Sequence, residues 1–79
     1  MQNNINQIQD NADTSLKEIL SLSDFQKKHA DKFTHAQLIW MLRNRKRNKL
    51  AGTGAVILAG RKFYINEPLF TQWFANQKA

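Results

Sequence analysis

The stretch that decides the fold covers residues 20–42 and reads LSLSDFQKKHADKFTHAQLIWML. It carries the same helix-start signal twice, because Ser21 is followed three residues later by Asp24, and Thr34 by Gln37. At this spacing the first side chain accepts the N–H of the fourth residue, and the fourth side chain returns to the N–H of the first. The stretch therefore predicts two separate helices, each with its own N-terminal cap.

Apolar residues on either side of each cap indicate how these helices begin. Leu20 precedes the first cap and is placed to pack against Phe25. Phe33 precedes the second cap and stands in the same relation to Leu38. Such pairs form hydrophobic staples, which set the angle at which the chain enters a helix. The first helix is expected over about residues 22–30.

The second helix is expected from the Thr34 cap to near Asn48. Its apolar stripe comprises Leu38, Met41 and Leu42, with Arg45 at the edge of that stripe. Two capped helices joined by a short connection are typical of a helix-turn-helix.

Downstream of these helices, the apolar pattern changes from a helical to a strand-like period. Residues 55–58 read AVIL and residues 62–65 read KFYI, so a two-stranded β-hairpin is expected with its tip at residues 59–61. Phe63 and Tyr64 alternate along the second strand, so one is expected to face the core and the other solvent. We interpret this hairpin as a small wing.

A last helix is expected after the hairpin. Asn66 is a suitable N-cap, and Pro68 is tolerated because N–H groups of the first turn have no intrahelical acceptor. Ile65 is placed to pack against Phe70 as a third staple. The expected buried stripe of this helix comprises Leu69, Phe70, Trp73 and Phe74.

Upstream of residue 20 the sequence changes character. Residues 1–14 are rich in Asn and Gln and are expected to form a flexible polar arm. Ser15 and Glu18 have capping-box spacing, so a short helix is expected near them. One face of this helix would carry Leu16, Ile19 and Leu20.

Charge is concentrated in the middle of the chain. The 79 residues carry twelve Lys and Arg against six Asp and Glu, a net charge of +6. Residues 27–62 hold ten of the basic residues and only Asp31 as an acid, a net charge of +9. Such a local excess repels itself in a folded domain and attracts polyanions. We therefore expect a nucleic acid as partner.

Composition also excludes several classes of function. The length suits one domain, and the absence of cysteine removes disulfides, thiolate catalysis and most structural zinc sites. The glycines match neither the dinucleotide fingerprint nor the phosphate loop. We expect no enzyme activity, cofactor, metal or small-molecule substrate. No apolar run is longer than that of residues 55–59 and no signal peptide is apparent, so a soluble, cytoplasmic protein without membrane contact is expected.

The order helix, helix, hairpin, helix resembles the winged helix-turn-helix of small phage and plasmid excisionases and of the related AlpA-like and MerR-like DNA-binding domains. The resemblance covers residues 21–74. It is carried by the two capped helices, by Ala59-Gly60-Arg61-Lys62 at the hairpin tip and by Tyr64-Ile65-Asn66-Glu67 at its exit. It implies a winged helix-turn-helix domain over residues 15–79 that is α+β and mostly helical, with a two-stranded hairpin as wing.

The resemblance implies a function as well. We expect a sequence-specific double-stranded DNA-binding protein of a mobile element, either an excisionase-like architectural factor or a small transcriptional regulator. Self-association or cooperative binding of several copies on one DNA segment is part of this expectation. The alternative is a non-enzymatic accessory subunit of a nucleoprotein complex, whose basic face binds RNA or an acidic protein.

Candidates for base contact lie near the start of the second helix, where a recognition helix reads base edges. They are His35, Gln37 and Ile39. Gln37 can pair with adenine or be occupied by its own helix cap, and Thr34 is expected to be a cap that also touches phosphate. Trp40 points about 200° away from the apolar stripe. It is expected to pack beneath the wing or the last helix, with exposure at an interface as the alternative.

Basic residues complete the candidate site. Arg43, Lys46 and Arg47 lie outside the apolar stripe and are expected to face the DNA backbone or a base. Arg61 at the hairpin tip has the position to enter a minor groove or to bind phosphate, and Lys62 follows it. The full predicted DNA-binding set is Thr34, His35, Gln37, Ile39, Arg43, Lys46, Arg47, Arg61 and Lys62.

Overall fold

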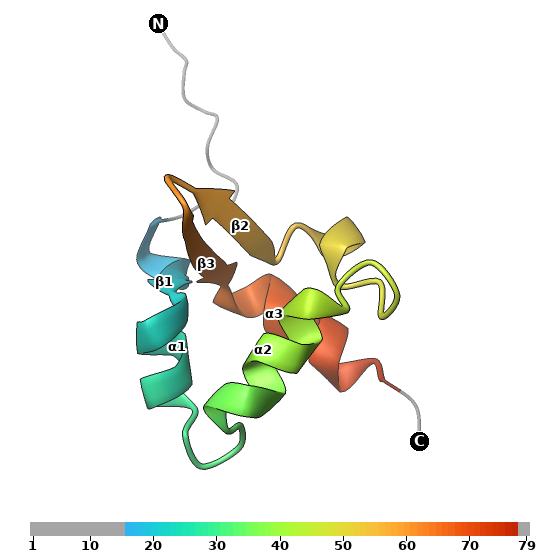
Figure 1. Ribbon diagram of the computed structural model, residues 1–79, viewed down its shortest axis with the longest axis horizontal. Helices are drawn as coiled ribbons and strands as arrows, with labels where there is room; N and C mark the ends of the chain where they lie inside the picture. The colour runs from blue at the N-terminus through green and yellow to red at the C-terminus, as the bar shows by residue number, and fades with distance from the viewer. Residues whose placement is uncertain (1–15, 78–79) are drawn as a thin grey trace, which may run out of the picture.

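A computed structural model describes residues 16–77 of the chain, so the expected polar arm over residues 1–14 lies outside the described residues. The described part is a small α+β fold with three helices and one antiparallel sheet (Figure 1). In chain order the elements are a 3₁₀ turn at Leu16–Glu18, β1 (Ile19–Ser21), α1 (Leu22–Lys28), α2 (His35–Arg43), a 3₁₀ turn at Ala51–Thr53, β2 (Val56–Ala59), β3 (Lys62–Asn66) and α3 (Glu67–Ala75). None of these helices is long and apolar enough to cross a membrane.

The three predicted helix starts are confirmed. The Asp24 N–H donates to Ser21 Oγ at 3.1 Å, and the N-cap Asn66 accepts a hydrogen bond from the first turn of α3. Thr34 forms a complete capping box, since its N–H donates to Gln37 Oε1 at 2.8 Å and its Oγ1 accepts the Gln37 N–H at 3.1 Å. Local side-chain hydrogen bonds therefore decide where each helix begins.

The sheet has three strands in the order β1-β3-β2, so the prediction of a two-stranded hairpin is incomplete. The expected helix near residues 15–20 is wrong: a 3₁₀ turn is followed by β1, which pairs antiparallel with β3. Ile19 lies opposite Asn66 and Ser21 lies opposite Tyr64. One edge of β3 supplies the hydrogen-bond partners for the backbone N–H and C=O groups of β1. This partner strand lies far away in the sequence.

The hairpin itself is confirmed, with Ala59 paired to Lys62 across a two-residue turn. Phe63 packs against the hydrophobic core, as expected for one residue of the alternating pair. Tyr64 is half-buried rather than fully exposed. It belongs to the central strand, which has a neighbour on each side.

Helix α2 ends at Arg43, well before the predicted end near Asn48. Side chains add hydrogen bonds to carbonyl groups of its last turns, which also accept backbone N–H groups. Asn44 Nδ2 donates to the Trp40 carbonyl at 2.8 Å, and Arg45 Nη1 donates to the Leu42 carbonyl at 2.6 Å. Such local bonds compete with the helical pattern and turn the chain away from the helix axis. Helix α1 also ends slightly early, at Lys28.

The core is a cluster of aromatic and aliphatic side chains between the helices and the sheet. The ring centroid of Phe70 lies 4.8 Å from that of Phe25 and 5.9 Å from that of Phe33. Leu38 and Leu42 bring the predicted stripe of α2 into the same cluster. The buried residues of this core are Phe25, Phe33, Leu38, Leu42, Leu50, Ala55, Ile65 and Phe70. Phe74 was expected in the core but is 46% exposed, because it lies near the C-terminal end of α3.

Asn48 connects the segment after α2 to the rest of the fold. Its side-chain amide donates to the Met41 carbonyl at 3.2 Å, and its Oδ1 accepts the N–H of the fully buried Leu50 at 3.0 Å. Its backbone carbonyl accepts the indole N–H of Trp73 at 2.9 Å. One residue thereby holds α2, the following turns and α3 together.

We expect Asn48→Ala to lower the free energy of unfolding by about 1–3 kcal/mol, because it leaves the buried N–H of Leu50 without its acceptor. The matched control is Asn44→Ala, which removes one hydrogen bond at an exposed site and is expected to cost less than about 1 kcal/mol. Urea denaturation followed by circular dichroism measures both. Equal losses in the two variants would contradict this role of Asn48.

Candidate nucleic-acid interface

Some of the basic residues are neutralised within the fold. Glu67, at the start of α3, accepts a hydrogen bond from Lys28 Nζ at 2.9 Å and lies 2.6 Å from His29 Nε2. Lys32 pairs with Asp31 at 3.1 Å. The contacts of Lys28 and His29 with Glu67 tie the end of α1 to the start of α3.

The Lys28 pair also lowers the pKa of the Glu67 carboxyl, with a further contribution from His29 and against an opposing effect of burial. A carboxyl whose pKa is lower in the folded state stabilises the fold above its ordinary pKa of 4.5. This contribution is lost as the pH falls through the lowered value. The contact therefore supports the fold at neutral pH.

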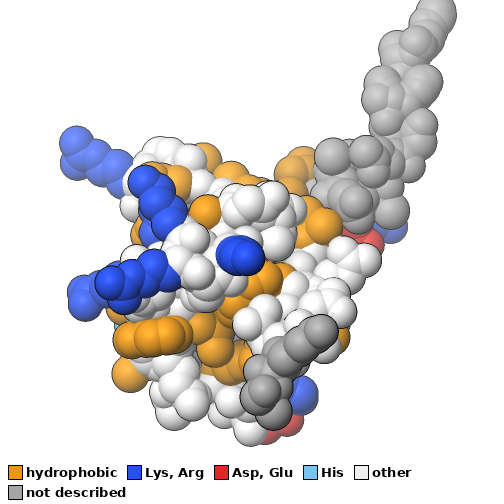
Figure 2. Space-filling model, turned by 90° about the vertical axis from the view of Figure 1, so that its right-hand side faces the viewer, with side chains coloured by type: hydrophobic (Ala, Val, Ile, Leu, Met, Phe, Trp, Pro, Cys, Tyr) orange, Lys and Arg blue, Asp and Glu red, His pale blue; other side chains and the backbone are white. Residues whose placement is uncertain are grey.

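A second group of basic residues is exposed and takes part in none of the ion pairs found in residues 16–77. Figure 2 shows several Lys and Arg side chains gathered on the left of that view, while others lie next to the acidic side chains on its right. We call the five of them that lie at and after the end of α2 and at the hairpin the basic face: Arg43, Lys46, Arg47, Arg61 and Lys62. Lys27 and Lys49 are also exposed and outside these ion pairs. The charges of the basic face are not balanced by nearby carboxylates of the described chain.

Three members of the basic face lie where α2 ends. Arg43, Lys46 and Arg47 line one shallow hollow of about 310 Å³. Lys46 and Arg47 were predicted on the helix, but they lie on the turns that follow it, because α2 ends at Arg43. Three cations around one hollow form a suitable site for a phosphate group.

Arg45, in the same segment, has a different role. Its guanidinium lies 5.4 Å from the centroid of the Phe63 ring, and it also donates to a carbonyl of α2. Arg45 is therefore a packing residue, which agrees with its predicted place at the edge of the apolar stripe.

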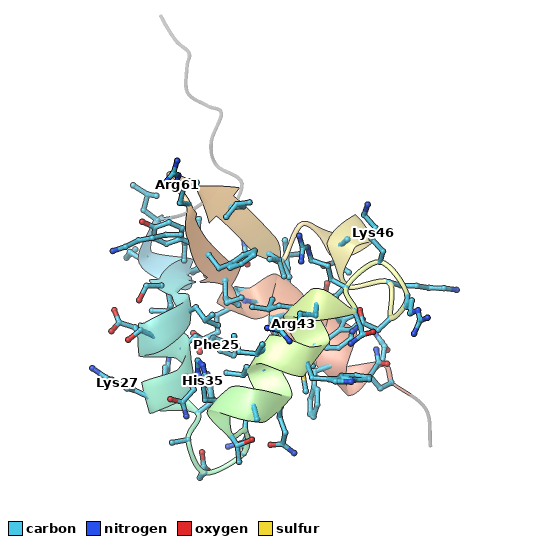
Figure 3. The ribbon with its side chains drawn as sticks, viewed as in Figure 1. Phe25, Lys27, His35, Arg43, Lys46 and Arg61 are labelled. Carbon is cyan, nitrogen blue, oxygen red and sulfur yellow. The ribbon has the colours of Figure 1, made fainter. Side chains whose placement is uncertain are left out.

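Arg61 projects from the tip of the hairpin (Figure 3). Gly60 and Arg61 form the two-residue turn and have φ angles of 57° and 68°. Positive φ at both central residues is the mark of a type I′ turn, whose twist matches that of the strands. Glycine adopts this conformation freely, whereas an arginine there is strained. The hairpin thus presents a charged side chain where its backbone favours glycine.

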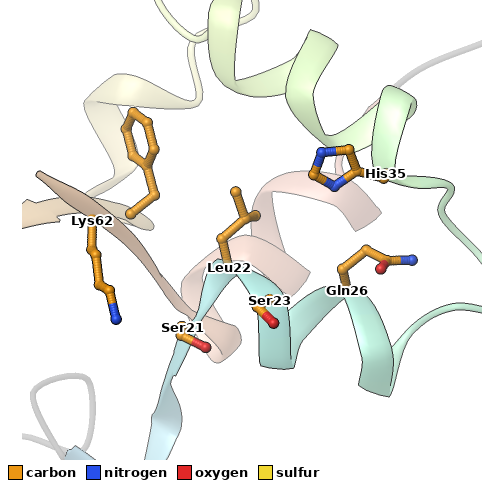
Figure 4. Close-up of a pocket in the computed structure, with 7 residues that line it drawn as sticks. Ser21, Leu22, Ser23, Gln26, His35 and Lys62 are labelled. Carbon is orange, nitrogen blue, oxygen red and sulfur yellow. The ribbon is translucent and has the colours of Figure 1, made fainter.

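A hollow of about 510 Å³ brings the start of α2 and the hairpin together (Figure 4). His35 and Lys62 lie on opposite sides of it, with Leu22 between them. Both residues belong to the predicted DNA-binding set. Nothing in the sequence indicates that they line the same hollow. The remaining lining residues, none of which belongs to the predicted DNA-binding set, are Ser21, Ser23, Gln26 and Phe63.

The other predicted contacts of α2 occupy its first two turns. Thr34 and Gln37 are exposed, and both belong to the capping box, so the capping role of Gln37 is confirmed. Only its amide group remains available for a base. Ile39 is half-buried and lines a shallow hollow with Trp40. The favoured prediction that Trp40 packs beneath the wing or last helix is wrong, because its side chain is 62% exposed.

The chain matches no protein-family model, no curated protein and no solved structure with which it was compared. Within residues 16–77, no three metal-ligating side chains lie close enough together to hold an ion.

We expect Arg61→Gly to raise the free energy of unfolding by up to about 1 kcal/mol, since glycine adopts the positive φ without strain. This corresponds to a melting temperature roughly 4–8 °C higher for a domain of this size. The control Arg61→Ala removes the same charge but keeps a Cβ, so no such gain is expected. Differential scanning calorimetry compares the two. A lower melting temperature for Arg61→Gly would show that the Arg61 side chain stabilises the fold.

Proposed function

We propose that this protein binds double-stranded DNA sequence-specifically through a winged helix-turn-helix, with α2 in the major groove and the β2-β3 hairpin against the neighbouring backbone. The observation that carries this proposal is the basic face, whose five exposed cations take part in none of the ion pairs of residues 16–77. They lie at and after the end of α2 and at the hairpin, the two places at which such a domain meets phosphates.

The arrangement of the helices supports the same proposal. α1 and α2 are joined by the connection of residues 29–34, and the apolar stripe of α2 is buried against the core. The opposite face of α2 is consequently free to enter a groove, with His35 in its first turn. Phosphate contacts by the basic face would set the register, and side chains of α2 would read base edges.

We further propose that the protein serves a mobile element, as an excisionase-like architectural factor or a small transcriptional regulator. A single DNA-binding module buries about 600–1,000 Å² of protein surface, which limits its selectivity. Several copies bound side by side would supply the remaining contacts and would favour a bent duplex. Sedimentation of protein on duplexes carrying one or several sites measures this stoichiometry.

The second candidate function is a non-enzymatic accessory subunit that binds RNA or an acidic protein through the basic face. Exposed Trp40 beside Arg43 supports it, because unpaired bases stack on aromatic side chains near cations. Sequence-specific RNA-binding sheets carry their stacking aromatics on strands, whereas Trp40 belongs to a helix. Competition between duplex DNA and single-stranded RNA of equal length distinguishes the two functions.

We expect binding to duplex DNA to depend strongly on salt, with a slope of about −4 to −6 in a plot of log K against log salt concentration. Each cation that engages a phosphate contributes to this slope by releasing counterions. Fluorescence anisotropy of a labelled duplex selected from a random pool gives the measurement. A slope near zero, or displacement of the duplex by an equal amount of single-stranded RNA, would overturn the proposal.

Variants of single cations provide the control for this titration. Arg47→Ala and Lys62→Ala are expected to weaken all duplexes about equally and to reduce the size of the slope by about 1 each. Lys27→Ala removes the same charge from an exposed position on α1, away from Arg43 and Lys46 (Figure 3), and is expected to change little. If the three variants behaved alike, general charge rather than the basic face would explain the binding.

We expect Gln37→Glu to preserve the stability of the fold but to weaken DNA binding roughly 5-fold or more. Glutamate keeps the acceptor of the capping box and suits the start of a helix. The substitution removes the amide donor and places a negative charge toward the DNA. Loss of a base contact weakens binding by about 1–3 kcal/mol. Thermal melting and anisotropy are measured on the same sample. Unchanged affinity would exclude Gln37 from the interface.

A further inference from the structure

Helix α2 presents an apolar surface to solvent that the fold does not use. Trp40 is 62% exposed, and Ala36, one turn earlier, is exposed as well. Together with Ile39 they line a shallow hollow of about 350 Å³, bordered by His35 and Arg43. The grouping of these three apolar side chains around one hollow, rather than the exposure of a single residue, indicates contact with a partner.

The same helix face offers few groups for polar recognition. The side-chain oxygen of Gln37 is occupied by the capping box, which leaves only its amide NH₂ group, and the side-chain amide of Asn44 donates back to the Trp40 carbonyl. His35 and Arg43 remain as hydrogen-bonding side chains around the hollow. A ligand that fills this hollow must therefore offer an apolar group flanked by negative charge.

We propose that this face recognises the C5-methyl groups of thymine in the major groove, with Trp40 and Ala36 as the contact residues. The proposal rests on the proposed function. The thymine methyl is the apolar group that the major groove displays, and apolar side chains distinguish it from other base edges. Arg43, which borders the hollow, and the nearby cations Lys46 and Arg47 complement the phosphates on either side of such a base.

The Trp40 ring gives this contact its expected strength. Burying one methyl group against it changes affinity by about fourfold. In Figure 2, hydrophobic side chains lie directly beside the Lys and Arg side chains on the exposed surface. Apolar recognition and phosphate binding can therefore operate on the same duplex.

The test uses the full chain and a duplex selected from a random pool, in which each thymine is replaced in turn by deoxyuridine. This replacement removes only the C5-methyl group and leaves the hydrogen-bonding edges intact. We expect the wild-type protein to lose about fourfold in affinity at one or two positions. Trp40→Ala is expected to bind the thymine duplex more weakly and to show no further loss with deoxyuridine at those positions.

Phe74→Leu is the matched aromatic control, because Phe74 is also exposed but belongs to α3. It is expected to keep the full deoxyuridine penalty. Melting temperatures are recorded for both variants, and Trp40→Phe, which keeps an aromatic ring, is expected to retain part of the penalty.

Three results would overturn the inference while leaving the proposed function intact. They are salt-dependent duplex binding that ignores deoxyuridine, a deoxyuridine penalty that persists unchanged in Trp40→Ala, and a Trp40→Ala defect that is larger on single strands than on duplexes. The last result would assign Trp40 to stacking on unpaired bases. Failure of the wild-type protein to bind any selected duplex would overturn the proposed function as well.

Discussion

The contact between three phenylalanine rings is the interaction on which the rest of this structure depends. Phe25 comes from α1, Phe33 from the connection to α2, and Phe70 from α3, and all three are buried. Because each ring belongs to a different segment, their packing sets the position of the helices relative to one another. α2 is held on this cluster by Leu38 and Leu42, so its opposite face can point outward as a binding surface.

The basic residues form two groups: some make contacts within the fold, and others are exposed and available to bind a partner. Lys28 is paired with Glu67, and Arg45 packs over Phe63, so both stabilise contacts between elements. The basic face lacks such partners within the described residues, and its mutual repulsion opposes folding. Binding of a polyanion would remove that repulsion. The positive φ of Arg61 also opposes folding, because an arginine is strained in this conformation and a glycine is not.

Much of the fold follows from short-range patterns. Ser21, Thr34 and Asn66 were each predicted to begin a helix, and all three do, because a cap bonds N–H groups only a few residues away. The hairpin and the buried stripe of α2 are also local and were predicted correctly, although Ala59, predicted at the hairpin tip, pairs with Lys62 as the last residue of β2. The resemblance to a winged helix-turn-helix and the function that it implies remain proposals.

The sequence by itself determined the starts of the helices, the hairpin and the concentration of positive charge, since each depends on residues close together in the chain. Tertiary structure alone decided the pairing of β1 with β3 and the exposure of Trp40. It also decided that His35 and Lys62 share one hollow. These features depend on which distant backbone edges and side chains meet when the aromatic core closes, and a strand as short as β1 forms only when such a partner is in place.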